Sequence, residues 1–271
     1  MMNSILSVIS YPFMLRALIV GILVSLCASL LGVSLVLRRY SMIGDGLSHV
    51  GFGALAIAAA LNTAPLPVTI PIVVIAAFFI LRLTENSKVN GDSMIAVIST
   101  SSLAIGVMII SMTSGMNTDL NNYLFGSILS TSNQDMAVSI IISAILLGLY
   151  LLFYNRIFSI TFDEIFSKAT GTKTNIYISL IAVLTAVTIV LGMRLMGSML
   201  ISSLIIFPAL TSMRIFKTFK SVTICSAILS VVCFTVGLFI SYFYSAPTGA
   251  SIVVVNIIFL IIFSLIGKLK K

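Results

Sequence analysis

Long uncharged runs, each able to enter a bilayer, fill most of this chain and restrict it to very few folds. A bilayer crossing needs about 20 apolar residues, and backbone in hydrocarbon must satisfy its own hydrogen bonds, which a helix does. Hydrophobic residues make up 59% of the chain and charged residues 8%, whereas a soluble domain carries about 25% charged residues. These features predict an all-α polytopic membrane protein.

Nine apolar runs are candidate membrane spans. They lie near residues 13–37, 46–62, 66–82, 93–114, 136–154, 176–193, 196–213, 222–243 and 250–267. The second run is short, and almost nothing separates the sixth from the seventh, so those two could form one broken helix or a tight hairpin. We therefore expect eight or nine transmembrane helices in a single membrane domain over residues 1–271.

The placement of positive charge predicts the orientation in the membrane. Lys and Arg gather in alternate loops, whereas loops 115–135 and 244–249 contain neither. By the positive-inside rule the basic loops are cytoplasmic, which with nine spans puts the N-terminus outside and the C-terminus in the cytoplasm. Arg16 and Arg194 are exceptions near external ends of spans. The net charge of +8 thus reflects topology, and no nucleic acid is expected as a partner.

Sequence signatures of enzymes are missing. The chain has no HExxH, no GxSxG and no GxxxxGK[ST] phosphate-binding loop. A single histidine excludes a catalytic centre built from several histidines of one chain. We expect a transport subunit with no permanently bound cofactor, so any ATP hydrolysis belongs to a partner chain.

The single histidine, His49, follows Asp45 by four residues in the string GDGLSHVGFG. Residues four apart share one face of a helix, and an imidazole and a carboxylate so placed can bind one divalent cation. A plainer interpretation pairs Asp45 with the nearby Arg39. Zn²⁺ prefers about four ligands and Mn²⁺ about six, so two side chains form an incomplete site. Ser48, backbone carbonyls, water or the same pair from a second copy could complete it.

Glycine and proline mark two further places. Gly44, Gly46, Gly51 and Gly53 flank the Asp–His pair. Beyond ordinary packing, they could break a helix or turn backbone carbonyls toward a cavity. Pro208 lies inside an apolar run and is a candidate helix break or gate, with a kinked, well-packed helix as the alternative.

The longest loop on the expected cytoplasmic side covers about residues 155–175 and contains FDEIFSKATG. Its apolar residues are spaced for a short amphipathic helix that ends at Gly171. They are Phe162, Ile165, Phe166 and Ala169. Such a helix is too short to span, and it is either a docking element for a soluble partner or a connector lying at the membrane interface.

Four stretches carry a resemblance to a known family. They are VLRRYSMIGDGLSHVGFG (36–53), NNYLFGSIL (121–129), TFDEIFSKATG (161–171) and MGSMLISSLIIFPAL (196–210). With these motifs in order along nearly the whole chain, the sequence resembles the permease subunit of bacterial ABC importers for zinc, manganese and iron ions. SYPFMLRA, NNYLFGSIL and YFYSAPTGA are more similar to zinc-type members. Many members read SHAVLPG where this chain has SHVGFGA, so the usual proline after His49 is absent.

The resemblance implies a fold, a location and partners. The fold would be the compact, all-helical one of vitamin B12 and iron-siderophore permeases, forming a homodimer around a central path in the bacterial cytoplasmic membrane. A cytoplasmic ABC ATPase would dock beneath each copy, and an extracytoplasmic metal-binding protein or lipoprotein would deliver the ion. The resemblance assigns Asp45 and His49 to the metal path, and Asp163, Glu164 and Gly171 to the loop that contacts the ATPase.

These observations predict the permease subunit of an ABC transporter that imports a divalent metal ion, with zinc favoured and manganese or iron as alternatives. The ion is cargo, and ATP is used only by the partner ATPase. The competing hypothesis is an ion- or proton-coupled secondary metal transporter. Such proteins often show internal repeats and several buried acidic residues. This chain shows no clear repeat, and Asp45 is the acidic residue most closely tied to the polar entry of a span.

Overall fold

Helices account for all the regular structure in the computed structural model, which describes residues 11–86, 91–113, 126 and 132–269. They are α2 (Pro12–Leu37), α3 (Ile43–Ala60), α4 (Pro65–Asn86), α5 (Gly91–Met112), α7 (Asn133–Leu152), α8 (Tyr154–Phe162), α9 (Glu164–Ala169), α10 (Thr174–Met196), α11 (Ser198–Met213), α12 (Phe219–Tyr244) and α13 (Thr248–Leu269). Each of the nine predicted runs coincides with one long helix, with ends that differ by a few residues. Within the described residues, seven helices are long and apolar enough to cross a membrane, and the apolar parts of α4 and α11 are shorter. The predicted all-α polytopic architecture is confirmed.

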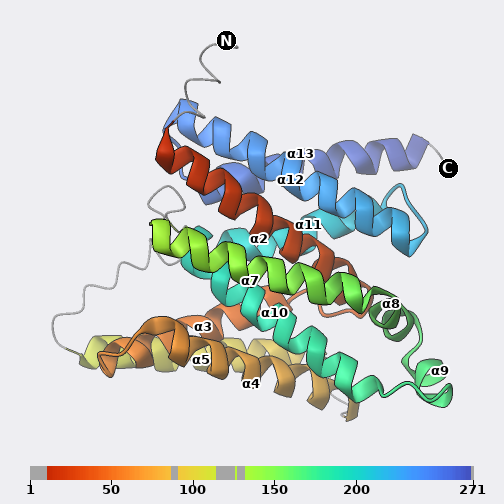
Figure 1. Ribbon diagram of the computed structural model, residues 1–271, viewed down its shortest axis with the longest axis horizontal. Coiled ribbons are helices and arrows are strands. Elements are labelled where there is room, and N and C mark those ends of the chain that lie inside the picture. The colour runs from red at the N-terminus through yellow and green to blue at the C-terminus, as the bar shows by residue number, and fades with distance from the viewer. Residues whose placement is uncertain (1–10, 87–90, 114–125, 127–131, 270–271) are drawn as a thin grey trace.

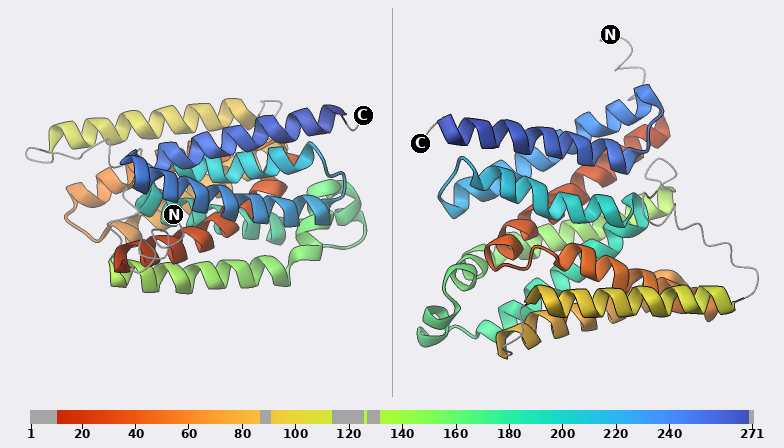
Figure 2. Two further views of the ribbon diagram at one scale, coloured as in Figure 1. Left: turned by 90° about the horizontal axis from the view of Figure 1, so that it is seen from above. Right: turned by 180° about the vertical axis from the view of Figure 1, so that it is seen from behind.

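Helix α2 occupies the centre of the bundle. It packs against α7, α10, α11 and α12, and most of its length is buried. Helix α3 packs chiefly against α4 and α5. Helices α10 and α11 each contact both α2 and α3. Figure 1 shows α3, α4 and α5 below α2, with α12 and α13 above it. In the left view of Figure 2, α5 and α13 lie toward one face of the molecule and α7 lies at the opposite face.

Serine hydroxyls join α2 to α12 inside the apolar core. Ser230 Oγ donates to the Ser25 carbonyl (2.9 Å), and Ser226 Oγ donates to the Ser29 carbonyl (3.3 Å). All four serines are buried. Helices in a membrane gain little from the hydrophobic effect between them, so small side chains and interhelical hydrogen bonds hold them together.

A tight reversal at Gly197 separates α10 from α11. Gly197 has φ 90° and ψ 159°, a conformation that favours glycine and is strained in other residues. Before the reversal, a Cβ added at Gly192 would overlap the side chain of Ile201, so the two helices touch closely. The sixth and seventh predicted runs are therefore separate helices joined by a sharp turn.

Pro208 lies inside α11, which continues without interruption from Ser198 to Met213. The structure thus shows no break at Pro208, and the interruption in this region is at Gly197. Pro208 is buried, and its carbonyl accepts a hydrogen bond from Ser212 Oγ (2.7 Å). Packing and local hydroxyl groups can hold a membrane helix together across a proline that lacks the backbone donor. A gating role for Pro208 stays a prediction.

Gly32 marks a close approach of α2 to α11, and its replacement should destabilise the fold. A Cβ at Gly32 would overlap the Ile205 carbonyl oxygen, which cannot move without shifting α11. We expect Gly32→Ala to lower the free energy of unfolding by about 1–3 kcal/mol, the usual cost of overpacking. Thermal unfolding of the purified protein in detergent measures the effect.

Gly148 on α7 is the matched control for this prediction. No atom lies within 4 Å of a Cβ added there, so Gly148→Ala costs no contact. Alanine is a better helix former than glycine by up to about 1 kcal/mol, so the thermal midpoint should stay unchanged or rise. Equal midpoints for the two variants would contradict the close contact of α2 with α11.

Candidate functional site

A rigid elbow, defined as residues 38–42, joins α2 to α3. Arg39 has φ 63°, and the N–H groups of Arg39 and Tyr40 donate back into the last turn of α2. These two hydrogen bonds form a Schellman motif, in which the left-handed position is usually glycine. The Tyr40 carbonyl accepts from Ile43 N–H (3.1 Å), so α3 begins directly after the elbow. The elbow thereby fixes where the first turn of α3 lies.

Asp45 and His49 lie one turn apart on α3, as the sequence predicted. His49 Nε2 is 3.7 Å from Asp45 Oδ2, with side chains 21% and 46% exposed respectively. His49 Nδ1 is buried and has no hydrogen-bond partner. Among the described residues, the Asp45 carboxylate lies within 4 Å of the His49 imidazole and makes no ion pair with Arg39. The plainer interpretation, an anion paired with Arg39, is therefore not what the structure shows.

The separation of these two ligand atoms suits one bound cation. Two ligands of a tetrahedral ion with bonds of about 2.1 Å lie about 3.4 Å apart, close to the Nε2–Oδ2 distance. Within the described part of the chain, no group of three or more His, Cys, Asp or Glu side chains is placed to hold a metal ion. A metal site built on Asp45 and His49 would therefore have two ligands from this part of the chain and be open on its exposed side. The assignment of the pair to the metal path stays a prediction.

The glycines around the pair serve close packing of α3. A Cβ at Gly46 would overlap the side chain of Ile95, and one at Gly53 would lie 2.8 Å from the Ser102 carbonyl oxygen, both on α5. Helix α3 itself is unbroken from Ile43 to Ala60. The expectation that these glycines break the helix is thus not met, because small residues are what lets α5 approach α3 so closely.

The predicted amphipathic loop forms two short helices, α8 and α9. Asp163 caps α9, since its Oδ1 accepts a hydrogen bond from Phe166 N–H (2.8 Å). Gly171 follows the helix with φ 83°, and the N–H of Thr172 donates to the Ser167 carbonyl (3.0 Å). The aspartate therefore starts the helix and the glycine ends it, which is the usual division of roles for these residue types.

Helix α9 lies at one end of the molecule (Figure 1). Its Ile165 is 85% exposed and its Phe166 is also exposed, as is Phe162 at the end of α8. Aromatic contacts hold helix α8 against Phe219 of α12. The ring centroids of Phe158 and Phe219 lie 5.1 Å apart. An uncovered apolar tip is typical of a surface that contacts a protein partner or the membrane interface. The role of this helix as a docking element stays a prediction.

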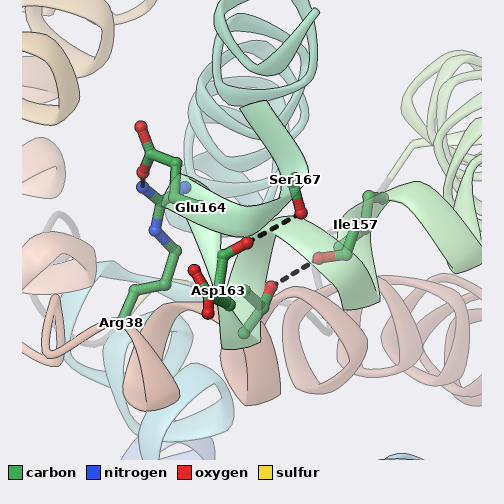
Figure 3. Close-up of polar contacts among 6 residues, drawn as sticks. Arg38, Ile157, Asp163, Glu164 and Ser167 are labelled. Atoms are coloured by element: carbon green, nitrogen blue, oxygen red, sulfur yellow. Dashed lines mark hydrogen bonds and ion pairs between the residues drawn. The ribbon is translucent and has the colours of Figure 1, made fainter. Parts of the chain in front are cut away.

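Two ion pairs join helices at opposite ends of the bundle. Arg38, at the end of α2, reaches Glu164 of α9 (Nη2–Oε2 2.6 Å), as Figure 3 shows. Arg194 of α10 meets Asp135 of α7 (2.9 Å). The family resemblance assigned Glu164 to the loop that contacts the ATPase, but the sequence did not identify Arg38 as the partner of Glu164. Only the fold brings residues 126 positions apart into contact.

Comparison with known proteins identifies the family of this chain. The family model for the ABC 3 transport family matches residues 10–267. The chain belongs to the ABC 3 transport family. Because the members of this family are components of transporters, the chain is a transport subunit and not an enzyme. The motif at residues 121–129 lies outside the described residues apart from Gly126.

The relatives of this chain are named for two different metals, manganese and zinc. It is 30% identical to ScaB, a manganese import system permease protein of Streptococcus gordonii, over 95% of this chain and 93% of that one. It is also 30% identical to ZnuB, a high-affinity zinc uptake system membrane protein of Haemophilus influenzae, over 95% and 98%. The solved structure of PsaBC from Streptococcus pneumoniae in complex with Fab superposes with a TM-score of 0.86, 30% identity and full coverage of both chains.

Proposed function

We propose that this chain is the permease subunit of an ABC importer that moves a divalent metal ion into the bacterial cytoplasm. The observation that carries the proposal is the Asp45–His49 pair, two ligand groups 3.7 Å apart on a membrane helix and open on one side. An imidazole and a carboxylate inside a membrane are costly unless they serve an ion or each other.

A second copy of the chain completes the site in this proposal. In a homodimer with two-fold symmetry, the same surface faces itself, so two Asp45–His49 pairs would supply four ligands. Four ligands match the preference of Zn²⁺. The single membrane domain over residues 1–271 then forms half of the central path, and the lipid bilayer surrounds the outer helices.

The partners follow from the two ends of the molecule. The exposed apolar tip of α9 docks a cytoplasmic ABC ATPase, which alone binds and hydrolyses ATP. This places Asp163, Glu164 and Gly171 in the coupling element and the C-terminus of the chain in the cytoplasm. The N-terminal end of α2 then lies at the outer surface, where an extracytoplasmic metal-binding protein or lipoprotein delivers the ion.

Zinc is the metal that we propose first. The pair supplies an imidazole nitrogen, which suits zinc better than manganese, and manganese favours sites rich in oxygen ligands. The stretches SYPFMLRA and YFYSAPTGA, more similar to zinc-type permeases, support the same choice. Relatives named for zinc and for manganese are equally identical to this chain, so the choice rests on the ligand chemistry and these stretches.

Reconstitution with the partners tests the proposal. Proteoliposomes that contain this chain and its ABC ATPase, supplied with the metal-binding protein, should take up zinc only when ATP is present on the ATPase side. Manganese at equal concentration should compete poorly. Zinc uptake that continues without the ATPase would identify a secondary transporter instead, and preferential uptake of manganese would overturn the choice of metal.

A further inference from the structure

The ion pair between Arg38 and Glu164 lies where the docking helix meets the elbow before α3. The Arg38 side chain is only 9% exposed and that of Glu164 31%. A charged hydrogen bond of 2.6 Å is strong, and a partly buried pair is screened by salt far less than a surface pair. Substitution of Glu164 removes this charged hydrogen bond from a nearly buried guanidinium. The contact is therefore more than a surface ion pair.

The Glu164 side of the pair is fixed to α9. Glu164 is the first residue of α9, directly after the capping Asp163. Ser167 Oγ donates to the Asp163 carbonyl (2.7 Å) and lies 2.7 Å from Ser159 Oγ of α8 (Figure 3 shows the first of these contacts). Because Glu164 belongs to α9 and follows the capping Asp163 directly, its carboxylate moves when α9 moves.

The Arg38 side of the pair is fixed to the elbow. Arg38 is the C-terminal cap of α2, and its guanidinium lies 5.8 Å from the ring centroid of the buried Tyr40. The Schellman motif then ties residues 38–40 to the last turn of α2, and α3 starts at Ile43. Asp45 lies in the first turn of α3. A shift of Arg38 therefore reaches Asp45 through a short segment that backbone hydrogen bonds tie to both helices.

Apolar contacts near the pair do not provide the same link. Helix α8 packs against α2 through its buried side, which includes Ile157 and Ile160, and α9 packs against α8 and α10. Apolar contacts are non-directional, so two helices packed through them can slide past each other. An ion pair with a short hydrogen bond opposes the separation of its two side chains. Among the described residues, the Arg38–Glu164 contact is the ion pair that joins α9 to the elbow.

We infer that the Arg38–Glu164 pair transmits displacement of α9 to the α2–α3 elbow and thereby sets the position of Asp45 and His49 during transport. Arg38 and Glu164 act as positioning residues and do not contact the ion. The inference rests on the proposed function, since it requires an ATPase that moves α9. In this inference, the Arg38–Glu164 contact is the connection through which ATP hydrolysis is coupled to Asp45 and His49.

The decisive experiment measures zinc ions transported per ATP hydrolysed in proteoliposomes that contain the permease, the ATPase and the metal-binding protein. For Arg38→Gln and Glu164→Gln, this ratio should fall about tenfold, the scale expected when one link in a coupling path is removed. ATPase binding by Arg38→Gln should stay within about twofold of wild type, because this substitution leaves α9 and its exposed tip untouched. The charge-swapped double variant R38E/E164R should recover most of the ratio.

Arg39→Gln is the matched control, because it removes the same charge one position along the elbow. The Arg39 guanidinium makes no ion pair with the described residues, and the ratio should remain at the wild-type value. Wild-type ratios in Arg38→Gln and Glu164→Gln would overturn the inference while leaving the proposed function intact. So would a loss of ATPase binding in Arg38→Gln, or a double variant no better than either single one. Failure of the wild-type complex to transport zinc with ATP would instead overturn the proposed function and the inference with it.

Discussion

Alanine at Asp45 or His49 is expected to reduce ATP-dependent zinc uptake by more than about tenfold, since even loss of an outer-shell partner of a metal ligand costs on the order of 10–100-fold in affinity. Each copy of the chain contributes these two ligands, so one substitution removes half of the proposed set. Asp45 forms no ion pair with the described residues apart from its contact with His49. The loss should therefore appear in transport and leave folding intact. Zinc uptake in proteoliposomes, and growth of cells under chelation, measure it.

Asp92→Asn controls for the removal of a carboxylate. Asp92 lies in the first turn of α5 and is exposed, as Asp45 lies in the first turn of α3. This variant should transport zinc at the wild-type rate. If Asp45→Ala and His49→Ala transport zinc as well as Asp92→Asn does, the pair is not part of the metal path. Thermal unfolding of all three variants separates a failure of transport from a failure to fold.

Glutamate at Ile165 is expected to detach the ATPase. Ile165 is 85% exposed at the tip of α9, and no other described residue covers it. Truncation of a central apolar anchor typically costs about 2 kcal/mol or more, so we expect ATPase binding to weaken by more than about 30-fold. The introduced charge must also be desolvated at the interface. Co-purification of the ATPase with the permease in detergent, followed by a quantitative binding assay, gives the affinity.

Leu61→Glu is the matched control for this substitution. Leu61 is 63% exposed and follows α3 at the end remote from the elbow, so the same charge is introduced far from α9. We expect its ATPase affinity to equal that of the wild type. Equal affinities for Ile165→Glu and Leu61→Glu would show that α9 is not the docking element. Wild-type zinc transport by Ile165→Glu would lead to the same conclusion.

The spans and the Asp–His pair could be predicted because both depend on local sequence. Apolar runs report bilayer crossings directly, since lipid requires apolar side chains and a helical backbone. The i, i+4 spacing of Asp45 and His49 needs only a helix to place both on one face. The loop helix was also predictable, because Asp163 and Gly171 are typical of a helix start and a helix end.

Other features needed contacts between distant residues. The glycines near His49 suggested a broken helix, but the proximity of α5 explains them, and that proximity depends on Ile95 and Ser102. Pro208 suggested a break, yet α11 continues through it because surrounding helices hold it in place. The break falls at Gly197, between the sixth and seventh apolar runs, where the sequence allowed a broken helix or a tight hairpin and the structure shows a sharp turn.

The sequence by itself determined the class of protein, the positions of the apolar runs and the placement of Asp45 and His49 on one helix face, because hydropathy and helical spacing act over a few residues. The tertiary structure alone decided that Arg38 meets Glu164 and that Gly32 touches the backbone of α11. Each of these depends on how helices pack across the bundle. Packing follows the fit of whole surfaces, which no single stretch of sequence records.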